Sequence, residues 1–124
     1  MFTTTVLTMF QPFFFFLLFQ GVILTVPGDT FVSQLTKTTI LIDVRTPEEF
    51  DEGHLSGAVN VSVTSIDFVN QINEFSKKGP IYVYCRSGKR SNRAANLMKA
   101  DGFPMMIELE KGYLAWQITN SIAQ

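Results

Sequence analysis

Short apolar runs alternate with one-sided apolar stripes from about residue 29 to the end of the chain. Four runs predict strands, at 39–44, 58–61, 81–84 and 105–109. The segments between and around them predict helices at 29–35, 47–50, 65–75, 91–100 and 111–119. Strands that alternate with helices at this pace predict an α/β fold, with a parallel sheet that helices cover on both faces.

The stripes also predict which helix residues face the core. In the 65–75 helix the apolar residues spaced three apart are Ile66, Val69, Ile72 and Phe75. In the 111–119 helix they are Leu114, Trp116 and Ile118. The 47–50 helix has Thr46 in the N-cap place and Pro47 at its first position, and Gly53 is expected to end that turn.

Residues 1–28 differ from the rest because they contain no charged residue and no histidine. Their apolar block has the length of a signal-peptide core and is shorter than the ~20 residues of a spanning helix. We therefore divide the chain into a signal peptide or membrane anchor at 1–28, left out of the fold, and a domain at 29–124. This implies a periplasmic, otherwise extracytoplasmic or membrane-anchored protein; a misassigned start or a buried segment are the alternatives.

Composition excludes several classes of function. A chain of 124 residues is expected to form one domain, and its net charge of −1 argues against bulk attraction to nucleic acid. Any membrane contact is expected only through residues 1–28. The chain has one Cys and one His, so an intramolecular disulfide is excluded and a structural metal site is not expected. A monomer is the default for a domain of this size.

The lone cysteine stands in a basic segment, between the end of a predicted buried strand and the start of a helix. Residues 80–100 contain Arg86, Lys89, Arg90, Arg93 and Lys99 and no acid. Positive charge and a helix N-terminus both favour a thiolate, and Gly88 lets the loop curl around it. A lone cysteine is more often an inert core residue. Here position and composition together predict that Cys85 is a nucleophile in an anion-binding loop.

Three segments resemble the signatures of rhodanese domains. The first comprises Asp43-Val44-Arg45, Glu49-Phe50 and the run GHLSGAVN at 53–60; the second is YVYCRSGKRS at 82–91, which resembles the family's active loop. The third is Asp101-Gly102-Phe103 with Gly112 and Trp116. Many relatives have two glycines where this chain has Lys111-Gly112, so the local turn is expected to differ.

The resemblance implies a three-layer rhodanese-like fold and a sulfurtransferase that moves a sulfane sulfur through a Cys85 persulfide. The donor would be thiosulfate or a similar small anion, the acceptor cyanide, a thiol or a protein, and no cofactor is implied. The substrate-binding loop would be Arg86, Ser87, Gly88, Lys89 and Arg90, with Arg90 the best candidate to hold the donor's sulfonate.

Four residues around the loop also match the family pattern. Asp43 is expected to pair with a basic group of the loop, and Arg45 to be a structural ion-pair partner. His54 is expected to hold a turn rather than to act as a base. Asn60 is expected to bond backbone near the loop.

Two other functions remain open. The domain could carry a persulfide for a partner protein with little turnover of small donors. It could instead be a cysteine phosphatase, but related phosphatases have one more residue between the positions of Cys85 and Arg90. The shorter loop seen here favours sulfur over phosphate.

Overall fold

Five parallel strands form the centre of the computed structural model, which describes residues 20–122. The strands are β1 (Val22–Val26), β2 (Ile40–Asp43), β3 (Val59–Asn60), β4 (Ile81–Tyr84) and β5 (Met105–Leu109), in the spatial order β1-β5-β4-β2-β3. The helices are α2 (Gly28–Ser33), α3 (Pro47–Glu52), α4 (Phe68–Ile72), α5 (Lys89–Ala100) and α6 (Gly112–Ile122). Strand β4, which precedes the cysteine, therefore lies in the middle of the sheet.

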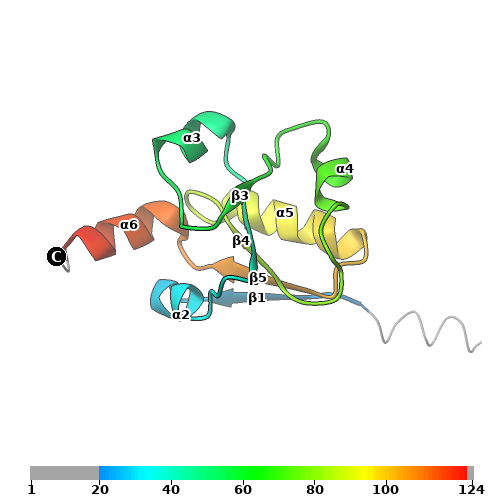
Figure 1. Ribbon diagram of the computed structural model, residues 1–124, viewed down its shortest axis with the longest axis horizontal. Helices are drawn as coiled ribbons and strands as arrows, with labels where there is room; N and C mark the ends of the chain where they lie inside the picture. The colour runs from blue at the N-terminus through cyan, green and yellow to red at the C-terminus, as the bar shows by residue number, and fades with distance from the viewer. Residues whose placement is uncertain (1–19, 123–124) are drawn as a thin grey trace, which may run out of the picture.

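Helices cover both faces of the sheet, as the sequence predicts (Figure 1). On one face α4 and α5 pack over a core that includes Ile72, Val83 and Met98. On the other face α2 and the start of α6 pack over a second core that includes Phe31 and Tyr113. Every residue of β4 is buried, which explains why its sequence is an uninterrupted apolar run.

The sheet contains a strand from the segment 1–28, which the sequence predicts to lie outside the fold. Strand β1 pairs with β5 along its whole length, from Val22 opposite Met105 to Val26 opposite Leu109, and Ile23 packs against the α5-side core. The prediction that 1–28 lies outside the fold is therefore wrong for β1. Within β1, Ile23 packs on one core and Val26 on the other, whereas Val22 and Leu24 are exposed at the edge of the sheet.

The predicted signal peptide or anchor otherwise falls on residues 1–19, which lie outside the described residues, so it stays a prediction. Within 20–122, no helix is long and apolar enough to cross a membrane.

Two helices bury only some of the residues predicted to face the core. Helix α4 is shorter than the predicted 65–75 and buries Phe68 and Ile72, which lie one turn apart on the side that faces the sheet, while Ile66 is fully exposed before the helix begins. Val69 is also exposed, and Phe75 is partly buried. In α6, Leu114 and Ile118 are exposed, Trp116 is partly buried, and the buried aromatic ring is that of Tyr113.

Deletion of β1 tests its place in the domain. We expect residues 29–124 to be less stable than residues 20–124 by roughly 3–5 kcal/mol, because Ile23 and Val26 lose their packing and β5 becomes an exposed edge. Thermal unfolding followed by circular dichroism measures the difference, expected to exceed about 10 °C. Equal unfolding temperatures for the two chains would show that β1 is dispensable.

Candidate active site

The cysteine lies where the central strand ends. Cys85 follows Tyr84, the last residue of β4, and only 1% of its surface is exposed. The backbone N–H of Gly88 donates a hydrogen bond to its sulfur at 3.0 Å. Gly88 has φ 105°, a left-handed conformation that glycine adopts readily, and it caps the N-terminus of α5. The sulfur thus lies in the curled loop that the sequence predicts.

The loop combines a buried sulfur with exposed cations. Arg86, Ser87 and Lys89 are exposed, and Ser91 is buried. The 12-residue helix α5 begins at Lys89, so its N-terminal partial positive charge lies beside the loop. This arrangement favours a negative charge on the sulfur or on a bound anion.

The start of α6 packs directly on the backbone of the loop. Tyr113 N–H donates to the carbonyl of Cys85 at 2.8 Å, and Leu114 N–H donates to that of Arg86 at 3.2 Å. A Cβ atom at Gly112 would lie only 2.3 Å from the Arg86 carbonyl oxygen. Lys111 and Gly112 both have positive φ, 61° and 74°, so this lysine adopts the left-handed conformation that glycine favours. The turn therefore requires glycine at 112 and tolerates a strained lysine at 111.

Asp43 forms an ion pair, but with a different partner from the one predicted. Its carboxylate is fully buried and accepts from Arg45 Nε at 3.0 Å and Nη2 at 2.7 Å, whereas the sequence analysis placed its partner in the loop. Arg45 thus forms an ion pair, as predicted, and its partner is Asp43. The two charged groups meet because Arg45 lies two residues beyond Asp43, and its side chain folds back toward the end of β2.

Arg45 connects three parts of the site. Its Nη2 also donates to the Gly53 carbonyl at 2.7 Å, and its guanidinium carbon lies 4.5 Å from the centre of the Tyr113 ring. Burial alone would lower the pKa of Arg45, but the hydrogen bond and charge of Asp43 outweigh it and raise that pKa. Burial also raises the pKa of neighbouring Tyr84 above its usual range. Both side chains therefore keep their protons.

Arg90, the predicted sulfonate ligand, is paired with a carboxylate. Its Nη1 and Nη2 donate to the two oxygens of Glu49, at 2.6 and 2.9 Å. This hydrogen bonding raises the pKa of Arg90 and lowers that of Glu49 to about 2. Glu49 also closes the capping box of α3 with Thr46. The pair leaves Arg86 and Lys89 as the exposed cations of the segment 85–90, and a sulfonate-binding role for Arg90 stays a prediction.

The remaining predicted residues bind backbone. His54 is exposed, has Nδ1 2.8 Å from the Phe50 carbonyl oxygen and stacks on the Phe50 ring, an arrangement that holds the turn after α3. Asn60 donates to the carbonyls of Asp43 at 3.0 Å and Arg45 at 2.9 Å. Both residues thus make the kinds of contact predicted for them.

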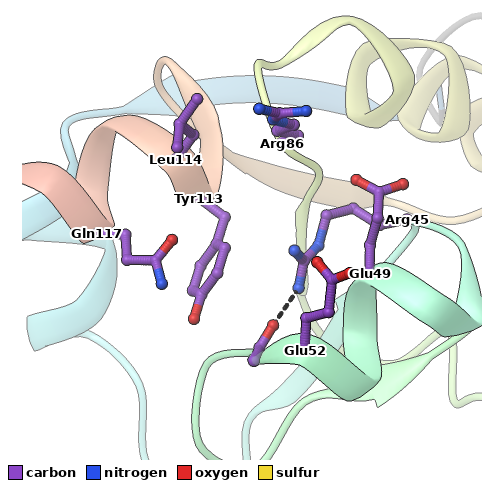
Figure 2. Close-up of a pocket in the computed structure, with 8 residues that line it drawn as sticks. Arg45, Glu49, Glu52, Arg86, Tyr113, Leu114 and Gln117 are labelled. Carbon is purple, nitrogen blue, oxygen red and sulfur yellow. Dashed lines mark hydrogen bonds between the residues drawn. The ribbon is translucent and has the colours of Figure 1, made fainter.

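A pocket of about 280 Å³ lies beside the loop (Figure 2). It is lined by Arg45, Glu49, Glu52, Gly53, Arg86, Tyr113, Leu114 and Gln117. In Figure 2 Arg45 and Glu52 lie across the opening from Tyr113 and Gln117 of α6. Sequence reasoning missed the α6 residues, because only packing of α6 against the loop brings them there. The spacing of Thr46 and Glu49 in the sequence is that of a capping box. No local pattern indicates that Glu49 also binds Arg90.

These features define a class of protein: a parallel α/β domain with a buried cysteine in the loop that follows its central strand, beside the N-terminus of a helix. Residues 29–119 match the family described as the Rhodanese-like domain, and the chain belongs to that family. The rhodanese-like domain of the Alr3790 protein from Anabaena sp., solved by NMR, has the same fold. It is 26% identical with a TM-score of 0.69, and the match covers 77% of this chain and 74% of that one.

Curated relatives share moderate identity over part of the chain. Thiosulfate sulfurtransferase 16, chloroplastic, of Arabidopsis thaliana is 38% identical over 85 residues, covering 60% of this chain and 71% of that protein. Two Bacillus subtilis proteins match over 76 residues, 61% of this chain: the uncharacterized YqhL at 37% identity and YrkF, named as a proposed sulfur carrier, at 34%. The chain covers only 59% and 40% of the length of these two proteins.

The Glu49–Arg90 pair gives the fold a defined acid dependence. Because the pKa of Glu49 is lowered from 4.5 to about 2, its contribution is complete above pH 4.5 and is lost as pH falls toward 2. The two side chains are 26% and 30% exposed, so we expect about 1–2 kcal/mol of stability relative to Glu49→Gln at neutral pH. Urea unfolding at neutral pH and near pH 3 should show this difference shrinking; a constant difference would contradict it.

Two glycine substitutions separate the effect of the close contact between α6 and the loop from the effect of backbone strain. Gly57 has φ 83° but no atom within 4 Å of a Cβ built on it, so Gly57→Ala reports strain alone and should cost about 1 kcal/mol. Gly112→Ala adds a collision with Arg86 and should cost roughly 2–3 kcal/mol. It should also slow alkylation of Cys85 by iodoacetamide, whereas Gly57→Ala should not. Equal alkylation rates in both variants would show that α6 does not shape the loop.

Proposed function

We propose that this protein is a sulfurtransferase that takes a sulfane sulfur from thiosulfate, or a similar small anion, onto Cys85. The observation that carries the proposal is the sulfur of Cys85, held by the Gly88 N–H at 3.0 Å beside the N-terminus of α5. This environment favours a thiolate and the persulfide anion derived from it. Family membership and the Arabidopsis relative's name support the same chemistry.

The reaction balances as two displacements. The Cys85 thiolate attacks the outer sulfur of thiosulfate, an S–S bond forms to Cys85, and the original S–S bond breaks with its electron pair leaving on sulfite. An acceptor nucleophile, cyanide or a thiolate, then attacks the outer persulfide sulfur and the Cys85 thiolate leaves. A thiolate nucleophile needs no further general base, so the backbone-bound His54 has no step to perform.

The loop supplies the positive charge that the donor requires. Arg86 and Lys89 are exposed in the loop around the sulfur, and Arg86 also lines the pocket. In this proposal these two residues attract the sulfonate of the incoming donor. Arg90 acts differently in this proposal, because its bidentate contact with Glu49 fixes the first turn of α5 against α3. Cys85 itself is buried, so the outer sulfur of the donor must enter the loop to reach the thiolate.

A persulfide carrier is the second candidate. The name of the relative YrkF supports it, and so does the low exposure of Cys85, which shields a stored persulfide from solvent. In that case the acceptor is a protein, and small donors turn over slowly. A phosphatase is disfavoured because Cys85 and Arg90 are separated by only four residues.

Steady-state thiocyanate formation tests the enzyme proposal. The full chain with thiosulfate and cyanide should turn over, and Cys85→Ser should abolish turnover because the nucleophile is lost. Arg86→Ala should raise KM for thiosulfate roughly tenfold while changing kcat little, since it removes attraction for the donor rather than the reacting sulfur.

Three outcomes separate the candidates. Turnover that disappears in Cys85→Ser supports the enzyme. A persulfide on Cys85 without turnover supports the carrier. Hydrolysis of an aryl phosphate with no persulfide would overturn both proposals in favour of a phosphatase.

A further inference from the structure

Glu108 is a buried carboxyl group that the proposed reaction does not use. It lies in β5 with only 3% of its surface exposed. Among residues 20–122, no basic side chain lies within 4.0 Å of its oxygens. Burying a carboxyl group without a cation is costly unless specific hydrogen bonds compensate. Its hydrogen-bond partners therefore indicate what the group does.

Both partners of Glu108 belong to the first turn of α5. Its Oε1 accepts from Ser91 Oγ at 3.0 Å, and its Oε2 accepts from Asn92 Nδ2 at 3.2 Å. The same two residues hold the carbonyl of Gly88, through Ser91 Oγ at 3.1 Å and the Asn92 backbone N–H at 3.1 Å. Ser91 has one hydroxyl proton, which the Glu108 oxygen and the Gly88 carbonyl share.

The other end of Gly88 holds the sulfur. The Gly88 N–H donates to Cys85 Sγ, and the Gly88 carbonyl accepts from Ser91, which Glu108 also binds. The register places Glu108 close to this point. Val83 is its partner across the strand pair, and Cys85 lies two residues farther along, so Glu108 and Cys85 share the sheet face under α5.

We propose that Glu108 is a positioning residue for Cys85. It fixes Ser91 and Asn92, these two fix the Gly88 carbonyl, and the Gly88 N–H then keeps its direction toward the sulfur. Loss of the hydrogen bonds at Glu108 loosens the Ser91 and Asn92 side chains, so the Gly88 N–H keeps its direction less strictly and stabilises the thiolate less well. This inference rests on the proposed function only in taking Cys85 as the reactive nucleophile.

Two uncharged variants separate hydrogen bonding from charge. In Glu108→Gln, the side-chain amide can donate to Ser91 Oγ and its carbonyl can accept from Asn92. Glu108→Leu has nearly the same size but makes neither bond. Because neither variant carries a charge, the ratio of their Cys85 reactivities reports the hydrogen bonds alone.

The readout is the rate of alkylation of Cys85 by iodoacetamide near neutral pH, which is specific because the chain has one cysteine. Glu108→Leu should react at least about fivefold more slowly than Glu108→Gln, which should react no more slowly than the wild type. Met106→Ala is the matched control, since Met106 is fully buried on the same face of β5 but bonds nothing in the loop. It should lose stability and keep its alkylation rate within roughly twofold.

Ser91→Ala keeps the test decisive if Glu108→Leu does not fold. Ser91→Ala should slow alkylation about fivefold. Adding Glu108→Gln to Ser91→Ala should change the rate by less than about twofold, because both residues act through the same series of hydrogen bonds. Equal rates for the Gln and Leu variants, or a wild-type rate for Ser91→Ala, would overturn the proposal. Alkylation needs no sulfur donor, so a failure of thiosulfate turnover would refute the proposed function without affecting this test.

Discussion

The hydrogen bond from the Gly88 N–H to the sulfur of Cys85 is the contact on which the site depends. It exists because the central strand β4 ends at Tyr84 and the chain must turn within a few residues to begin α5. Parallel strands end at one edge, so the turn lies against the ends of β2 and β5 and against the start of α6. The sheet thus brings a backbone donor, a helix N-terminus and a thiol to one point.

The two ion pairs around the loop hold its neighbouring elements in place, and their cations are bonded to carboxylates of the protein. Asp43 and Arg45 are buried together, and Arg45 Nη2 also donates to the Gly53 carbonyl, so the buried guanidinium has partners on β2 and after α3. Glu49 and Arg90 join α3 to α5 in a similar way. Within the segment 85–90, Arg86 and Lys89 are the cations left exposed.

Local pattern was sufficient to predict the strands β2 to β5, the helices between them and the Cys85 loop, because each has a distinctive run of residues. Local pattern failed where the place of a segment or the partner of a side chain depends on the tertiary structure. Strand β1 continues an uncharged apolar segment, so its pattern could not be told from a signal sequence. The ion-pair partner of Asp43 and the packing of Tyr113 depend on how the chain turns back, and neither has a signature in the sequence.

We propose that Cys85 accepts a sulfur atom, whether the protein then acts as an enzyme or as a carrier. Mass spectrometry of the intact chain and of its Cys85 peptide, after incubation with thiosulfate alone, tests this most directly. We expect one added sulfur atom on that peptide, which cyanide or a thiol reductant removes. An unchanged mass in folded protein, with Cys85 still open to alkylation, would contradict it.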